Sequence, residues 1–119
     1  MILALILAAA TPAPDCRNAM TQADMNICAG QQRESADRAL NATWKRASDI
    51  ARARSRADFN LLLDAQRKWL AYRDAQCVAE NGRRGPGSGS MWPMQQSACI
   101  TGLTQERTKR LRIYIDAPR

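Results

Sequence analysis

Three polar residues of this chain fall where a helix would carry apolar ones, and their types could support ionic chemistry inside a protein. In the stretch DAQRKWLAYRDAQC (64–77), Gln66 and Arg73 lie in the middle of an apolar stripe at helical spacing. Arg107 lies in a similar stripe further along the chain. A buried guanidinium is costly unless a carboxylate and further acceptors satisfy it. These positions therefore predict an internal polar network, and we expect it to fix the packing rather than to catalyse a reaction.

Four cysteines in the pattern C-x11-C-x48-C-x21-C are the second group with chemistry of their own. A structural zinc site uses cysteines separated by about two to four residues, with histidine as the usual alternative ligand. This chain has no such pair and no histidine. An even number of cysteines in a small chain is typical of disulfides. We expect two disulfides, no metal and no other cofactor.

The parts of an enzyme are missing from the sequence. There is no histidine, both disulfides would consume the thiols, and no serine stands next to a recognisable base. Glu34 and Asp37 share a helix face at a spacing of three residues, which suits a solvated edge and a salt bridge better than catalysis. The glycine-rich GRRGPGSGS follows a helix and lacks the Lys-Ser/Thr ending of a P-loop. We therefore expect no enzymatic activity.

Capping signals divide most of the chain into helices. Thr21 opens a first helix with a capping-box variant, and the helical stripe runs to about Arg54. Ser55 repeats the signal at once, so a second helix follows and ends before Gly82. So short a link favours an antiparallel pair of helices.

A glycine- and proline-rich stretch, GRRGPGSGSMWP (82–93), separates the second helix from a third. Ser90 is the expected cap of this third helix, with Pro93 tolerated in its first turn. No alternation with period two and no internal repeat occurs. The pattern predicts an all-α fold, a small antiparallel three-helix bundle.

Four cysteines allow three pairings, and the helix positions favour Cys16–Cys28 with Cys77–Cys99. Cys77 ends the second helix and Cys99 opens the third, so this pair would clamp both ends of the glycine-rich loop. Cys16 would reach Cys28 if the N-terminal segment folds back on the first helix. Each disulfide is expected to stabilise the thin core by about 2–4 kcal/mol.

The helix ends also set which polar residues come level with one another. If the first two helices turn back at residue 54, Arg73 comes level with Asp37. The Cys77–Cys99 pairing then brings Arg107 level with Gln66. The expected internal polar network has five members: Asp37, Asn41, Gln66, Arg73 and Arg107.

The N-terminal residues MILALILAAA resemble a secretory signal peptide, although they lack a Lys or Arg at the start. We expect residues 1–10 to be this signal and residues 11–119 to form one domain, located in the periplasm or secreted. The apolar run is too short for a transmembrane segment. A buried N-terminal strand is the alternative.

The net charge of +7 and the pI of about 9.9 suggest anionic partners. Acidic residues are interspersed among the arginines, so an ordinary solvated surface is the simpler explanation. The sequence signatures of nucleic-acid binding are absent, and we expect no nucleic-acid partner.

The same residues carry a family resemblance. The chain resembles the LprI N-terminal-like family of exported bacterial proteins, and the likeness covers essentially everything after the expected signal. The block AQxxWxxYRxxxC, which ends at Cys77, is the most specific part of the likeness. Earlier in the chain, the tyrosine that is usual in the family at position 44 is a tryptophan. The resemblance implies inhibition of lysozyme, an activity attributed to a lipoprotein member. The lipid-anchoring context is absent around Cys16, so membrane attachment is not implied. The remaining matching residues are Cys16, Ala19, Thr21, Gln22, Met25, Asn26, Cys28, Ala29, Asp37, Leu40, Asn41, Leu63, Gly87, Ser88, Cys99, Thr104, Arg107 and Leu111.

The function that follows is inhibition by a clamped loop. Arg83, Arg84 and Ser88 lie between Cys77 and Cys99 and could pair with the catalytic carboxylates of a lysozyme or another wall glycosidase. The simpler alternative is a flexible connector between two helices.

A periplasmic binding module is the second functional hypothesis. It would hold anionic envelope polymers or lipid headgroups through the arginines of residues 52–56 together with Arg83 and Arg84. A chaperone-like or assembly role is a third possibility that no feature of the sequence favours.

Overall fold

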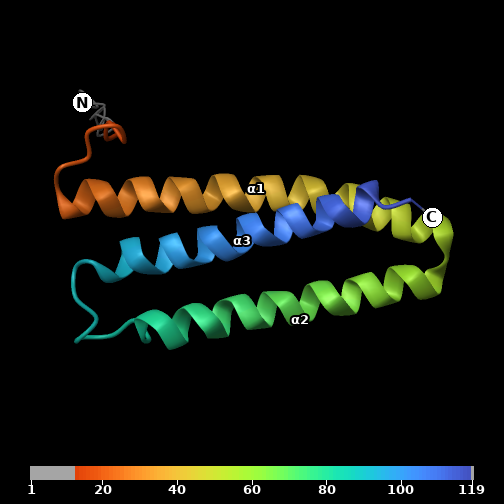
Figure 1. Cartoon of the computed structure of the whole chain (residues 1–119). Coiled ribbons are helices and arrows are strands. Elements are labelled where there is room, and N and C mark those ends of the chain that lie inside the picture. Colours follow the sequence, from red (N-terminus) through yellow and green to blue (C-terminus); the bar gives the residue numbers. More distant parts are fainter. Residues whose placement is uncertain (1–12, 119) are drawn as a thin grey trace, which may run out of the picture.

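The computed structural model describes residues 13–118 and consists of three long helices: α1 (Gln22–Arg54), α2 (Arg56–Asn81) and α3 (Trp92–Asp116) (Figure 1). The second helix runs antiparallel to the other two. No strand occurs within residues 13–118, and the predicted all-α three-helix fold is confirmed. The expected signal at residues 1–10 lies outside the described residues. Among the described helices, none combines the length and apolar character that a membrane span requires.

Serine and threonine caps begin α1 and α2 where the sequence predicts them. The Thr21 hydroxyl accepts a hydrogen bond from the backbone N–H of Asp24 at 3.1 Å, and the Ser55 hydroxyl accepts one from Asp58 at 2.9 Å. Ser55 is extended and is the only residue between the two helices. At the end of α2, Gly82 has a φ of 76°, a conformation that glycine adopts without strain. These local signals therefore position the α1–α2 hairpin.

The predicted cap of α3 is wrong by one residue. Met91, not Ser90, is the N-cap, and its side chain makes no capping hydrogen bond. Pro93 has no N–H, so this end has one donor fewer to satisfy. The Ser90 carbonyl instead accepts a hydrogen bond from Asn26 on α1 at 2.9 Å. The start of α3 is therefore held by a contact with α1 rather than by a cap.

Small side chains are prominent among the buried residues of α1 and α3, the two helices that share the most extensive interface. On α1 the alanines at 36, 47 and 51 are buried, and on α3 the threonines at 101, 104 and 108 are buried. Small residues allow close approach of two helices. The row of threonines is a feature that the sequence analysis missed. Larger apolar residues fill the rest of the core: Leu40, Trp44, Phe59, Leu62, Trp69, Leu111, Tyr114 and Ile115.

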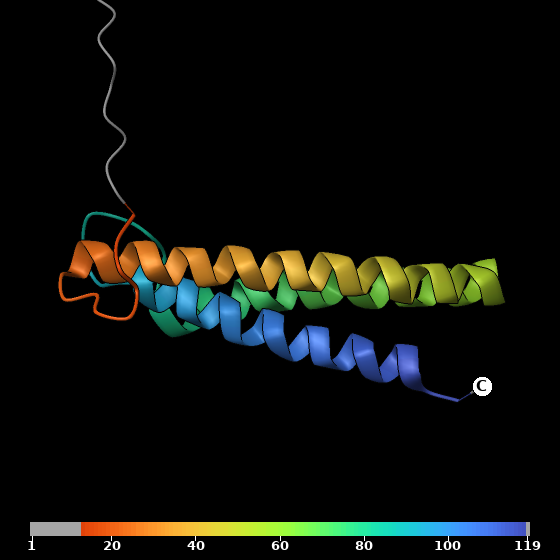
Figure 2. The ribbon, with the colours of Figure 1, turned by 90° about the horizontal axis from the view of Figure 1, so that it is seen from above.

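Both predicted disulfides are present. Cys16 pairs with Cys28 and ties the segment before α1 back onto that helix. Cys77 pairs with Cys99 and joins the last turns of α2 to the first turns of α3. Seen from above, α3 diverges from the α1–α2 hairpin toward its C-terminal end (Figure 2). Both disulfides therefore lie at the end that carries the loop. The other end is held by apolar packing that includes Leu62, Leu111 and Tyr114, and by the hydrogen bond from Arg54 to Tyr114.

We expect the paired replacement of Cys77 and Cys99 by serine to lower the free energy of unfolding by about 2–4 kcal/mol, because the loop that the disulfide closes gains freedom in the unfolded chain. Urea denaturation followed by far-ultraviolet circular dichroism measures this change. An unchanged midpoint and slope would contradict it.

A second stability prediction concerns Thr101, whose hydroxyl is buried and has no hydrogen-bond partner among the described residues. We expect Thr101→Val to stabilise the protein by about 1 kcal/mol, because the substitution removes an unsatisfied polar atom at nearly constant shape. Thr108→Val is the matched control, since the Thr108 hydroxyl donates to the Thr104 carbonyl. A lower melting temperature for Thr101→Val would show that its hydroxyl is satisfied.

Candidate functional site

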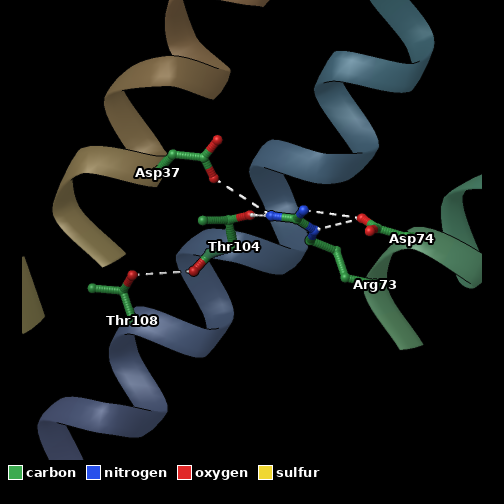
Figure 3. A network of polar contacts seen from close by, with 5 residues as sticks. All are labelled: Asp37, Arg73, Asp74, Thr104 and Thr108. Carbon is green, nitrogen blue, oxygen red and sulfur yellow. Dashed lines mark hydrogen bonds and ion pairs between the residues drawn. The ribbon is translucent and has the colours of Figure 1, made fainter. Parts of the chain in front are cut away.

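Arg73 is the buried centre at which the three helices meet (Figure 3). Its Nη1 lies 3.4 Å from the Asp37 carboxylate on α1 and donates to the Thr104 hydroxyl on α3 at 3.3 Å. Its Nε and Nη2 lie 3.0 and 2.9 Å from one oxygen of Asp74, the next residue of α2. One guanidinium therefore connects side chains from all three helices.

The surroundings of Arg73 suit charge compensation. The Asp37 and Asp74 side chains are 42% and 59% exposed, so each carboxylate remains partly hydrated while it neutralises the buried cation. Thr104 is fully buried and supplies the acceptor on the inner side. The cluster contains no nucleophile with an adjacent base, so its chemistry is that of an ion pair.

Arg107 forms a second cluster in the same interior. Its Nε donates to the Gln66 amide oxygen at 2.8 Å. The ring of Trp69 lies beside both guanidiniums, with its centroid 5.4 Å from Cζ of Arg73 and 5.9 Å from Cζ of Arg107. Burial lowers the pKa of Arg107, and the positive charge of Arg110 lowers it further. No carboxylate lies within ion-pair distance of Arg107 in the described part of the chain.

The predicted network residues are thus only partly brought together. Asp37 contacts Arg73, Gln66 contacts Arg107, and Trp69 lies between the two pairs. Asn41 is exposed and makes no hydrogen bond to any of them. Two further members were missed by the sequence analysis, Asp74 and Thr104. Asp74 follows Arg73 directly, and Thr104 precedes Arg107 by three residues, so adjacency and helical spacing were the available signals.

The loop of residues 82–91 is attached to the bundle at several points. The Trp92 indole donates to the Gly82 carbonyl at 2.9 Å, and Asn26 donates to the Ser90 carbonyl at 2.9 Å. Within the loop, the Ser88 hydroxyl donates to the Gly85 carbonyl at 2.7 Å. Ser88 therefore shapes the turn, and its hydroxyl hydrogen is already engaged.

The two loop arginines differ in their surroundings. The Arg84 guanidinium lies over the Trp92 ring at 6.0 Å from its centroid. Arg83 is exposed and has no ion pair or hydrogen bond to any side chain that the structure describes. Beside them, Arg84, Ser88 and Trp92 help to line a hollow of about 420 Å³. Arg83 is the loop cation most available to a partner.

The basic turn between α1 and α2 is packed against the protein. The Arg52 guanidinium lies 4.2 Å above the Phe59 ring, and Arg54 donates to the Tyr114 hydroxyl at 3.3 Å. Arg56 is exposed. The described residues contain no group of three or more His, Cys, Asp or Glu side chains that could hold a metal ion.

Removal of the Asp37 carboxylate tests the buried ion pair. We expect Asp37→Ala to lower the free energy of unfolding by about 1–3 kcal/mol, because it deprives a buried cation of its partner on another helix. The matched control is Asp74→Ala. It removes a more exposed carboxylate that lies on α2, the same helix as Arg73, and it should lower the free energy of unfolding by less than about 1 kcal/mol. Urea denaturation measures the loss of unfolding free energy in both variants. Equal losses for Asp37→Ala and Asp74→Ala would contradict a special role for the ion pair between α1 and α2.

Comparison with known proteins places this architecture in a family. The family profile described as lysozyme inhibitor LprI matches residues 14–111, a range that includes all four cysteines, Arg73, Arg107 and the loop. An uncharacterized protein of Rhizobium meliloti (strain 1021) is 41% identical over an alignment of 118 residues, and the match covers 89% of this chain and 82% of that relative. No solved structure matches the chain. Because the profile spans most of the sequence, the chain belongs to the LprI lysozyme inhibitor family.

Proposed function

We propose that this protein inhibits a lysozyme or a related wall glycosidase by inserting the loop of residues 82–91 into the substrate cleft. The family description supports inhibition rather than catalysis. Residues 11–119 would be the active domain, acting in the periplasm or outside the cell after removal of residues 1–10. The observation that carries the proposal is Arg83, which is exposed and unpaired among residues 13–118, on a loop that is tied down at both ends.

The attachment of the loop favours tight binding. The Cys77–Cys99 disulfide, the Trp92–Gly82 hydrogen bond and the contact from Asn26 restrain the loop before any partner arrives. A restrained segment loses less conformational entropy when it binds, so more of the contact energy appears as affinity.

The chemistry of the target suits a guanidinium. Glycoside hydrolases that follow the usual mechanism place two carboxyl groups on either side of the scissile bond. Arginine binds a carboxylate with two parallel hydrogen bonds, which gives both energy and orientation. Arg83 would take this role, while Arg84 remains stacked on Trp92 and Ser88 keeps the turn in shape.

The net charge indicates which targets should be bound most readily. At +7, the protein repels a basic glycosidase at long range and attracts an acidic one. We therefore expect faster association with acidic wall glycosidases than with basic ones. Added salt should reduce this difference in association rate, because it screens both the attraction and the repulsion.

The direct test is to titrate the purified, oxidised protein into wall glycosidases of several types and to follow lysis of cell walls. We expect saturable inhibition of at least one type, with the inhibition constant raised about tenfold or more by Arg83→Ala, since a central arginine contact is typical of binding hot spots. The matched control is Arg56→Ala, which removes an exposed arginine at the opposite end of the bundle, where α2 begins.

Two results would contradict the proposal. The first is no inhibition of any glycosidase at concentrations where the protein is folded. The second is inhibition that Arg83→Ala and Arg56→Ala reduce equally, because that pattern reports net charge alone and not insertion of the loop.

A further inference from the structure

An apolar groove runs between α2 and α3 at the end of the bundle opposite the loop. It consists of two adjoining hollows of about 240 and 270 Å³, which share Leu62, Ala65 and Tyr114. We call this the α2–α3 groove. Its apolar lining comes from Leu61, Leu62, Ala65, Leu111, Ile113, Tyr114 and Ala117.

The rim of the groove exposes large apolar side chains. Leu61 on α2 is 71% exposed and Ile113 on α3 is 59% exposed. They lie at the end where α3 diverges from the hairpin (Figure 2). Exposed apolar side chains grouped around a groove are more typical of an interaction surface than scattered ones are.

Two arginines line the larger hollow of this groove and make no ion pair within residues 13–118, while Asp58 lines the smaller hollow. Arg107 is half-buried and has Gln66 as its only hydrogen-bond acceptor among the described residues. Arg110, one turn further along α3, makes no ion pair with any described residue. Both line the groove, and the lowered pKa of Arg107 reflects its burial and the nearby charge of Arg110. A carboxylate of a partner would compensate the half-buried charge of Arg107 and offset its repulsion from Arg110.

We propose that the α2–α3 groove docks an amphipathic, acidic helix of a partner protein. The lining runs over about two turns of α2 and about three turns of α3, which matches a short helical segment. Apolar residues of the partner at i, i+4 and i+7 fill the groove between Leu61 and Ile113. Its Asp or Glu side chains bind Arg107 and Arg110.

Other occupants fit the groove less well. A small amphiphile usually needs a pocket that encloses most of its surface, and both hollows are open along the groove. A second copy of this chain also carries +7, so self-association would bring like charges together. A helix whose negative charges lie over Arg107 and Arg110, away from Asp58 in the smaller hollow, satisfies both the shape and the electrostatics.

This surface is separate from the proposed inhibitory loop. Leu61 and the end of α2 at Asn81 are 20 residues apart, which corresponds to about 30 Å along the helix axis. The groove could therefore be occupied while the loop is bound elsewhere, and the inference does not rest on the proposed inhibition.

The test selects binding helices from a displayed library of single helical peptides, with the oxidised full chain as the target. We expect enriched sequences to carry Leu, Ile or Phe at i, i+4 and i+7 together with two or more Asp or Glu. A synthetic peptide of the enriched sequence should bind Arg110→Glu and Leu61→Glu about tenfold or more weakly than the wild-type chain. Both side chains are exposed, so neither substitution threatens the fold.

Arg38→Glu is the matched control, because it makes the same change of charge at an exposed arginine of α1 outside the groove. Unchanged affinity for this variant supports the proposal. No enrichment, or an equal loss of affinity in Arg38→Glu and Arg110→Glu, overturns it.

Two further results would reassign the groove and so overturn the proposal. One is binding to phosphatidylglycerol vesicles that Leu61→Glu abolishes, with no helix enriched. The other is a dimer in light scattering that Leu61→Glu dissociates.

Discussion

The burial of a single guanidinium at the junction of three helices is the constraint on which the rest of this structure depends. Arg73 must find acceptors within hydrogen-bond distance, so α1 has to present Asp37 and α3 has to present Thr104 at its level. The small alanine and threonine side chains between α1 and α3 would fit in several registers. We infer that the ion pair selects one of them.

That register has consequences for the two ends of the bundle. Cys77 follows Arg73 by one helical turn, so the residues that hold Arg73 also set the position from which the Cys77–Cys99 disulfide reaches α3. The loop beyond it is presented from the most constrained part of the molecule. At the other end no disulfide joins the described helices, and apolar packing together with the Arg54–Tyr114 hydrogen bond holds α3 to the hairpin. The groove lined by Arg107 and Arg110 lies at this end.

The parts of the fold that were predictable are those that short-range signals determine. Ser55 caps α2 and is the only residue between α1 and α2. Counting residues along the two helices from this turn therefore predicts that Arg73 lies opposite Asp37. The rotation of α3 could not be counted in this way, because ten residues with several glycines separate it from α2. For that reason the buried threonines and the Thr104 contact were missed. Asn41 lies at the expected position along the axis of α1, but its side chain is exposed. Counting residues along the helices does not show which way a side chain points.

A double-mutant cycle between Asp37 and Arg73 tests the central claim most directly. The four proteins are the wild type, Asp37→Asn, Arg73→Met and the double variant, each unfolded in urea. If the ion pair couples α1 to α2, the interaction free energy should be about 1–3 kcal/mol in favour of the pair. A coupling within about 0.3 kcal/mol of zero would mean that the two side chains act independently and that packing alone sets the register.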